Sequence, residues 1–173
     1  MGDIRGRDFL KLGDFETADI DEILDLAFEM KREQRQWSLK GKTVIMLFFN
    51  SSLRTRTSFE IGAAHLGAQP VVLNVGQDAW NLEWEEGTIM SGTSPEHIKD
   101  AAKVLSRYGD LLAVRSFPRM QNYEQDRMDP ILSSFSKYAS APLINLESAV
   151  EHPCQGLADL MTLQENFGEL EGL

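Results

Sequence analysis

The amino-acid sequence predicts an α/β protein with an open, parallel, four-stranded sheet and helices on both faces, in three α/β/α layers. Apolar runs of strand length alternate along the chain with segments of helical periodicity, an order typical of parallel sheets. The runs do not alternate between polar and apolar residues, which indicates strands covered on both faces. Ligands of such sheets bind beyond the carboxyl ends of the strands, so the loops after the strands are the expected place for a site.

The expected elements follow one another regularly. Apolar side chains recur every three or four residues from Thr17 to Gln36 and predict the first helix there. Further helices are expected over 54–66, with Gly67 as a left-handed cap, over 95–107, over 129–138 and over 153–167. In the third of these five helices, Ser94 is expected as the N-cap and Pro95 as the first helical residue. The expected strands are 44–49, 70–75, 110–116 and 142–147.

The composition fits one globular domain with a short additional segment. The chain has 173 residues, of which 42% are hydrophobic and 25% charged, and one domain is the usual content of such a length. Lys and Arg number 17 against 27 Asp and Glu, so the formal net charge is −10. Because nucleic acids and anionic membranes attract basic surfaces, neither is an expected partner.

Cysteine content and apolar runs indicate a cytoplasmic protein. Cys154 is the single cysteine, which argues against a disulfide framework and a cysteine-based zinc site. No apolar run approaches the roughly 20 residues of a membrane span, and the opening MGDIRGRDFL lacks the apolar stretch of a secretory signal.

The strongest functional signal is the segment FFNSSLRTRTSFE, residues 48–60. A buried strand runs there into a hydroxyl-rich loop and then into a helix that opens with Arg54, Thr55 and Arg56. A helix start offers free N–H groups and the positive end of its dipole, so the added hydroxyl and guanidinium groups form an anion cradle. The alternative is that Arg54 and Arg56 pair with local carboxylates. Neither the P-loop nor the GxGxxG pattern is present, which argues against ATP and NAD.

Two later segments place polar side chains after other strands. Arg115 ends the third strand and points to the same crevice, although a salt bridge is the alternative role. His152 precedes the last helix, and Gln155 lies three residues on, on the same face. An imidazole beside an amide suits polarising a carbonyl group and binding an amide NH₂. Cys154 faces another way and is expected to be a small core residue, not a nucleophile.

These segments together resemble the aspartate and ornithine carbamoyltransferase family, specifically its amino-terminal carbamoyl-phosphate domain. SSLRTR is similar to the family's Ser-x-Arg-Thr-Arg phosphate loop, and HPCQGLADL to its His-Pro-x-Gln-x-x-x-Asp segment. The resemblance implies a carbamoyl-phosphate-binding domain over residues 1–150 and the start of a connecting helix over residues 151–173. The family's second, amino-acid-binding domain, with its His-Cys-Leu-Pro segment, has no counterpart in this sequence, so we expect the chain alone to be an incomplete enzyme.

The same resemblance assigns roles within the site. The residues implied in binding carbamoyl phosphate are Ser52, Leu53 through its backbone, Arg54, Thr55, Arg115, His152 and Gln155. The side chains of Ser52, Arg54 and Thr55 and the backbone of Leu53 would hold the phosphate, while Arg115 and His152 would join Thr55 around the carbamoyl oxygen. Gln155 would bind the carbamoyl nitrogen. Fixed donors of this kind stabilise the charge that develops on the oxygen, and neither a metal nor an organic cofactor is required. These groups, at the ends of four strands, are expected to converge at the start of the second helix.

A narrower resemblance concerns the amine substrate. GQDAWNLEWEEGTIMSG and AVRSFPR are similar to the acylornithine branch, the N-acetylornithine and N-succinylornithine carbamoyltransferases. That branch implies a homotrimer in which Trp80 reaches into the neighbouring subunit's carbamoyl-phosphate site; anchoring its own loop is the alternative. Pro95 resembles succinyl-type enzymes, because acetyl-type relatives carry a glutamate that would repel a succinyl carboxylate. Glu147 is implied to contact the ornithine portion, with helix capping as the alternative.

The expected function is therefore transfer of a carbamoyl group from carbamoyl phosphate to the side-chain amine of an N-acylornithine, with succinyl favoured over acetyl, in arginine biosynthesis. Two alternatives stay open. One is an ordinary ornithine or aspartate carbamoyltransferase, and the other is a non-catalytic phosphate-binding module.

Overall fold

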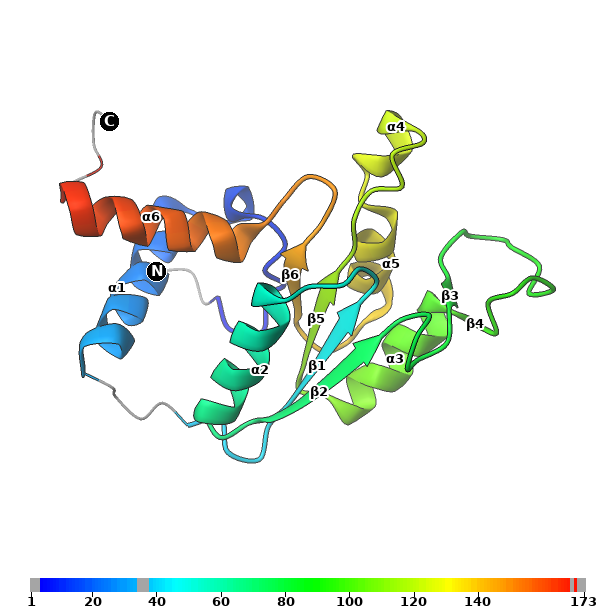
Figure 1. Cartoon of the computed structure of the whole chain (residues 1–173), viewed down its shortest axis with the longest axis horizontal. Coiled ribbons are helices and arrows are strands. Elements are labelled where there is room, and N and C mark those ends of the chain that lie inside the picture. The colour runs from blue at the N-terminus through cyan, green and yellow to red at the C-terminus, as the bar shows by residue number, and fades with distance from the viewer. Residues whose placement is uncertain (1–3, 34–37, 169, 171–173) are drawn as a thin grey trace.

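A four-stranded parallel sheet forms the centre of the molecule, as the sequence predicts. The computed structural model describes residues 4–33, 38–168 and 170. The sheet contains β1 (Thr43–Phe48), β2 (Gln69–Asn74), β5 (Leu111–Arg115) and β6 (Leu143–Glu147) in the order β2-β1-β5-β6 (Figure 1). Each strand lies within one residue of the predicted bounds at either end. All four carboxyl ends therefore lie along one edge of the sheet.

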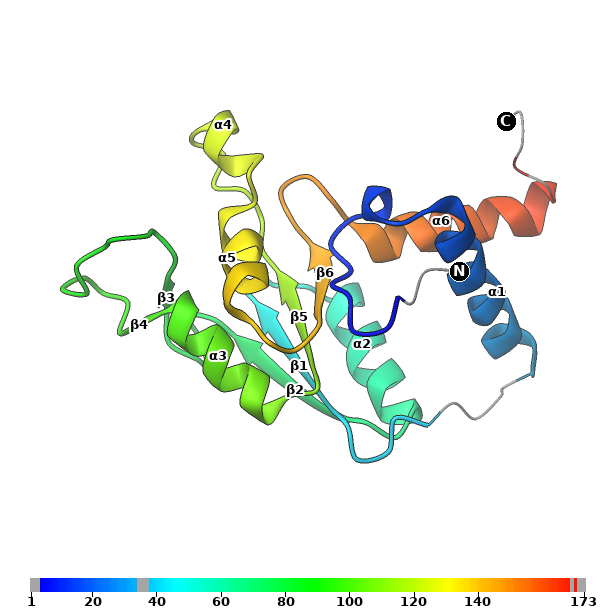
Figure 2. The ribbon, with the colours of Figure 1, turned by 180° about the vertical axis from the view of Figure 1, so that it is seen from behind.

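Helices cover both faces, which confirms the three-layer arrangement. Helix α2 (Arg54–His65) lies on one face, and α3 (Ile98–Tyr108) and α5 (Pro130–Tyr138) lie on the other (Figures 1 and 2). Successive β1 side chains go to opposite layers: Met46 packs with the α2 layer, whereas Ile45 and Leu47 pack with the α3 and α5 layer. Because both sides of β1 are buried, its sequence is apolar from Val44 to Phe48.

Two of the remaining helices lie beside the β6 edge of the sheet, and the third lies beyond the strand carboxyl ends. Helix α1 (Thr17–Glu33) contacts α6 (Pro153–Phe167), and α6 contacts β6 (Figure 1). The predicted end of the first helix at Gln36 lies outside the described residues. The short helix α4 (Tyr123–Asp126) projects on the side of the strand carboxyl ends and was not predicted. In the described part of the chain, no helix is long and apolar enough to cross a membrane.

The helix after the long loop begins later than predicted. Glu96–His97 form the short strand β4, which pairs with β3 (Leu82–Glu83), and α3 begins at Ile98. The N-cap is His97, whose Nδ1 accepts the Lys99 N–H at 3.1 Å. The prediction that Ser94 caps this helix and Pro95 opens it is therefore wrong. Pairing with β3 keeps residues 96–97 extended, and a buried imidazole replaces the expected hydroxyl cap.

The amino-terminal segment adds to the edge of the sheet, which the sequence did not indicate. The Phe9 N–H donates to the Leu143 carbonyl at 2.7 Å, and the Asn145 N–H donates to the Phe9 carbonyl at 2.9 Å. A 3₁₀ turn, η1 (Leu12–Asp14), follows. Residues near Phe9 thus supply backbone partners to β6 that would otherwise be missing at an edge strand.

Candidate active site

A cavity of about 610 Å³ lies at the carboxyl ends of β1, β5 and β6. It collects most of the residues that the sequence predicts for the site: Ser52, Leu53, Arg54, Thr55, Arg115, Glu147, His152 and Gln155. The loop after β2 contributes none of the residues that line it. The prediction of four converging strand ends is therefore wrong in number, because three strand ends form this cavity within the chain.

The start of α2 presents hydroxyl and N–H groups to the cavity. Leu53 is the N-cap by position, but its side chain makes no capping bond and is 80% exposed. Instead, Ser52 Oγ accepts the Thr55 N–H at 3.2 Å. A hydroxyl that accepts one bond still has its own proton to donate. Ser52 can therefore close the helix end and donate to an anion at the same time.

The two arginines at the start of α2 have different surroundings. Arg56 Nε lies 3.5 Å from Glu60 Oε2, one turn further along the helix. Arg54 is exposed at the cavity, and no carboxylate of the described residues lies within ion-pair distance of it. The surface-pair alternative therefore holds for Arg56 but not for Arg54, which is left available for an anion.

One carboxylate joins the groups from β5 and β6. Arg115 Nη1 forms an ion pair with Glu147 Oε2 and donates to Thr55 Oγ1 at 3.3 Å. His152 Nε2 lies 3.5 Å from the same Glu147 oxygen. Arg115 thus has the salt bridge that was its alternative role, but the partner belongs to the same cavity. Glu147 makes no helix-capping bond, since the α6 N-cap is His152.

An irregularity in the sheet explains how Glu147 reaches Arg115. Val114 pairs with Asn145, but Arg115 pairs with Glu147, so β6 contains one extra residue at this point. Such a bulge re-aims the side chains that follow it and is frequent beside active sites. In a regular ladder Leu146 would stand opposite Arg115. The bulge therefore places an acidic side chain where the pattern of the strand would place an apolar one.

Two buried polar atoms of the site have no hydrogen-bond partner within the described structure. Arg115 Nε and His152 Nδ1 are buried, and neither has a hydrogen-bond partner. Buried polar groups in proteins are nearly always hydrogen-bonded, so these two atoms, which belong to residues that line the cavity, are exceptions.

The start of α6 supplies an oriented amide. Gln155 is exposed to the cavity, and its Nε2 donates to Asp159 Oδ1 at 2.8 Å. This bond leaves the Gln155 carbonyl oxygen as an acceptor for an NH₂ group. Sequence reasoning assigned no role to Asp159, although the His-Pro-x-Gln-x-x-x-Asp spacing contained the signal. Burial raises the pKa of the neighbouring Cys154 thiol to about 11, which fits a structural residue and not a thiolate nucleophile.

Trp80 and Pro95 lie apart from this cavity in the same chain. Trp80 is 62% exposed, and its Nε1 donates to Glu96 Oε2 at 2.9 Å. Pro95 lines a separate cavity of about 270 Å³ together with Glu96. The chain therefore does not bring Trp80 or Pro95 to Thr55, but it does place the two on one surface, joined through Glu96.

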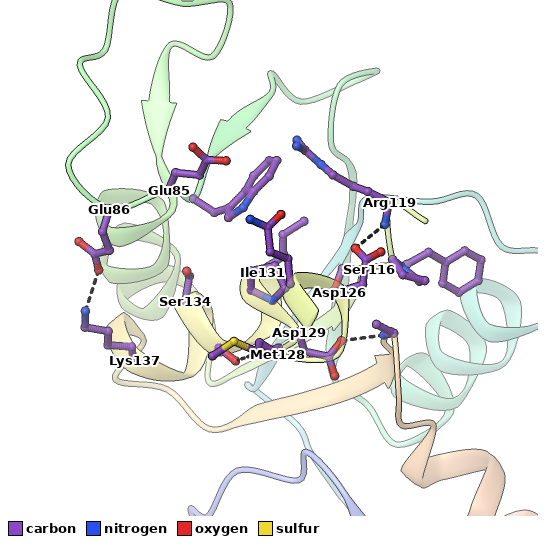
Figure 3. Close-up of a pocket in the computed structure, with 17 residues that line it drawn as sticks. Glu85, Glu86, Ser116, Arg119, Asp126, Met128, Asp129, Ile131, Ser134 and Lys137 are labelled. Carbon is purple, nitrogen blue, oxygen red and sulfur yellow. Dashed lines mark hydrogen bonds and ion pairs between the residues drawn. The ribbon is translucent and has the colours of Figure 1, made fainter. Parts of the chain in front are cut away.

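A third cavity, of about 550 Å³, lies between α5 and the loop after β5 (Figure 3). The Arg119 guanidinium lies 4.0 Å from the centre of the Trp84 ring, and Lys137 pairs with Glu86 at 2.7 Å. None of the predicted site residues lines this cavity. Among the described residues, no group of three or more His, Cys, Asp or Glu side chains is arranged to hold a metal ion.

The known proteins that this chain resembles are carbamoyltransferases. The family model described as "Aspartate/ornithine carbamoyltransferase, carbamoyl-P binding domain" matches residues 7–165. The N-acetylornithine carbamoyltransferase of Xanthomonas campestris is 48% identical over 160 residues, which are 92% of this chain and 47% of that protein. The N-succinylornithine carbamoyltransferase of Bacteroides fragilis is 41% identical over 152 residues, 87% of this chain and 48% of that protein.

Solved structures agree with these relatives. A mutant N-acetyl-L-ornithine transcarbamylase complexed with PALAO superposes with a TM-score of 0.92 at 46% identity, over 96% of this chain and 50% of that one. Another mutant of N-acetyl-L-ornithine transcarbamylase, with proline in place of a glutamate, was solved with carbamyl phosphate and N-succinyl-L-norvaline; its TM-score is 0.90 at 48% identity, over 94% of this chain and 48% of that one. The chain thus spans about half the length of the relatives that it matches.

Proposed function

The chain belongs to the aspartate/ornithine carbamoyltransferase family, and we propose that it binds carbamoyl phosphate in the cavity at the ends of β1, β5 and β6 for transfer to an N-acylornithine. One observation carries the proposal: Arg54, Thr55, Arg115, His152 and Gln155, from three separate segments of the sequence, line a single cavity. No single motif implies all five. An anion cradle, a cluster of donors and an amide acceptor together match a phosphate, a carbonyl oxygen and an NH₂ group.

The mechanism follows from where charge moves. The side-chain amine of the acceptor attacks the carbamoyl carbon, so negative charge develops on the carbonyl oxygen. Thr55, Arg115 and His152 donate to that oxygen, and donors fixed in advance stabilise such charge without reorganising. Gln155 holds the NH₂ group, which orients the carbon toward the amine. The carbon–nitrogen bond forms and the bond to the phosphate oxygen breaks. The proton lost by the attacking amine passes to the departing phosphate, which leaves against Arg54 and the start of α2. No step requires a metal or an organic cofactor.

Glu147 is proposed to guide the acceptor. It is a carboxylate at the carbamoyl end of the cavity, within 3.5 Å of His152 Nε2. A carboxylate at this place attracts the side-chain ammonium group of an ornithine derivative. Because Glu147 also pairs with Arg115, carbamoyl phosphate has to compete with that ion pair for the guanidinium.

The site is proposed to be completed by a neighbouring subunit of a homotrimer. Trp80 and Pro95 are implied in substrate binding but lie outside the cavity of their own chain. The hydrogen bond from Trp80 to Glu96, the residue after Pro95, holds both on one exposed surface. One neighbour could therefore deliver both residues to the same site.

The proposed acceptor is N-succinylornithine, and the transfer is assigned to arginine biosynthesis. Pro95 supports succinyl, because a neutral residue leaves room for an additional carboxylate where a glutamate would repel it. A relative with proline in place of a glutamate was solved with a succinyl compound. The higher overall identity to acetyl-type enzymes, 48% against 41%, points the other way, but it averages over the chain and does not weigh this pocket separately.

The test is an acceptor competition, run with the chain alone and with any longer product of its gene. Carbamoyl phosphate is supplied with N-succinylornithine, N-acetylornithine, ornithine or aspartate, and kcat/KM is compared. Pro95→Glu is expected to shift the preference from succinyl to acetyl, and Pro95→Ala, which adds no charge, should keep it. A preference for ornithine or aspartate would favour the ordinary carbamoyltransferases. Binding of phosphate without transfer to any acceptor, by the chain alone and by a longer gene product that contains a second domain, would favour a non-catalytic module.

A further inference from the structure

The turn 148–151 connects two groups of the proposed site, Glu147 at the end of β6 and His152 at the start of α6. Within the turn, the Ser148 N–H donates to the Glu151 carbonyl at 2.9 Å. The Glu151 N–H donates back to Ser148 Oγ at 3.2 Å. The shape of this turn therefore sets the separation of the Glu147 carboxylate and the His152 imidazole.

Asp129 holds the turn from a different part of the chain. Its Oδ2 accepts the Ser148 hydroxyl and its Oδ1 accepts the Ala149 N–H, each at 2.7 Å. Figure 3 shows Asp129 on the wall of the third cavity, with a dashed line from its carboxylate. From inside, Asn145 Nδ2 donates to Ser148 Oγ at 3.1 Å. Ser148 is thus held between the carboxylate of Asp129 and the buried amide of Asn145.

Two features show that the Asp129 carboxylate is committed to this turn. Asp129 is the N-cap of α5, where an aspartate usually accepts the first N–H groups of its own helix, yet it makes no capping bond. Its φ of 47° and ψ of 57° lie in the left-handed region, which costs a residue other than glycine on the order of 1 kcal/mol or more. The residue therefore gives up its local bonds and its relaxed backbone while binding a turn about 20 residues further on.

We propose that Asp129 is a positioning residue for carbamoyl transfer, which fixes Glu147 and His152 relative to Arg115 through the turn 148–151. The inference rests on the proposed function for the roles of these groups. This positioning role also predicts that the phosphate end and the carbamoyl end of the cavity respond differently to a change at Asp129. Ser52 lies in the loop between β1 and α2, and Arg54 and Thr55 lie in α2. The phosphate end of the cavity therefore does not depend on the turn, whereas the carbamoyl end does.

The test compares two ligands in Asp129→Asn. Asparagine keeps the size of the side chain and tolerates the left-handed backbone, but its amide nitrogen cannot accept a hydrogen bond. We expect unchanged affinity for inorganic phosphate, a lost preference for carbamoyl phosphate over phosphate, and a kcat lower by about 10–100-fold, the size that small misplacements of catalytic groups produce. Ser148→Ala, which removes one of the two bonds, should act in the same direction with a smaller effect.

Asp126→Asn is the matched control. The Asp126 carboxylate also accepts two bonds, the Arg119 and Met120 N–H groups at 2.9 Å each, and it lines the same cavity (Figure 3). It holds a different loop, so the ligand preference should stay at the wild-type level. The contrary outcome is that Asp129→Asn and Asp126→Asn lower the thermal midpoint equally and show the same preference for carbamoyl phosphate over phosphate and the same kcat. In that case Asp129 has only a structural role and the inference is wrong.

A readout without turnover separates this inference from the proposed function. The sequence has three histidines, so the His152 imidazole signals can be assigned by NMR. They should shift or broaden in Asp129→Asn and stay in place in Asp126→Asn. If the His152 signals move in Asp129→Asn while neither the wild-type chain nor its longer gene product transfers a carbamoyl group, the positioning role is supported and the proposed reaction is contradicted. Unmoved signals in Asp129→Asn would overturn the positioning role, whatever the activity.

Discussion

Replacing Arg54 with alanine should weaken phosphate binding far more than the same change at Arg56. Arg54 faces the cavity without an ion-pair partner among the described residues, whereas Arg56 pairs with Glu60. Both variants remove one positive charge from the same helical turn, so their long-range effect on an anion is nearly equal. The difference between them isolates direct contact with the bound phosphate.

The magnitude follows from the contacts that are lost. A hydrogen bond to a charged group contributes about 1.5–3 kcal/mol, and a guanidinium can make two such bonds to one phosphate. Because part of the loss is recovered by water, we expect about 2–4 kcal/mol for Arg54→Ala, which is roughly a 30-fold to 800-fold weaker Kd. Arg56→Ala should lose less than about 1 kcal/mol, the usual scale of an exposed ion pair.

Isothermal titration of the chain with inorganic phosphate and with carbamoyl phosphate measures both effects. Arg54→Lys keeps the charge but not the planar fork, so it should fall between wild type and Arg54→Ala. Equal losses in Arg54→Ala and Arg56→Ala would mean that the anion senses only the general field. The anion would then not sit against Arg54, and the assignment of the phosphate end of the site would be refuted.

Three further predictions concern other parts of the structure. Asp159→Ala removes the bond that orients the Gln155 amide. It should raise the KM for carbamoyl phosphate about 2-fold to 10-fold, the value of the one neutral hydrogen bond between the Gln155 oxygen and the carbamoyl NH₂ group. An unchanged KM would mean that Asp159 has no role in the site. The Cys154 thiol, with its pKa raised from 9.0 to about 11, should react with a disulfide reagent at pH 8 about 100-fold more slowly than a free thiol. Between pH 9 and 11 the unfolded chain loses this proton and the folded chain keeps it, so the free energy of unfolding should fall as pH rises, and Cys154→Ala should abolish that part of the decrease. Gly109→Ala would place a Cβ 2.8 Å from Ile45 Cδ1 and should lower the free energy of unfolding by about 1–3 kcal/mol in a denaturant titration, whereas Gly62→Ala, with nothing within 4 Å, should not lower it.

The layers of the fold and the segments that form the site can be predicted from the amino-acid sequence. Strand β1 is recognisable because both of its faces are buried, so apolar side chains fill every position after Thr43. The last helix begins at Pro153, as predicted, because proline fits only the first turn of a helix. The site segments could also be found, since each follows a strand and the ends of parallel strands share one edge. These features depend on residues close together along the chain.

Which side chains contact one another depends on the packing of the whole fold. Arg54 and Arg56 both open the same helix, and only the packed elements show that Arg54 lines the cavity while Arg56 lies outside it. Glu147 faces Arg115 because of a bulge in β6, and no local pattern of that strand announces an extra residue. Asp129 holds a turn about 20 residues away instead of capping its own helix. Local preferences fix the backbone of an element, but a polar side chain takes its partner from whatever the packed elements bring within about 3 Å, and that depends on the whole fold.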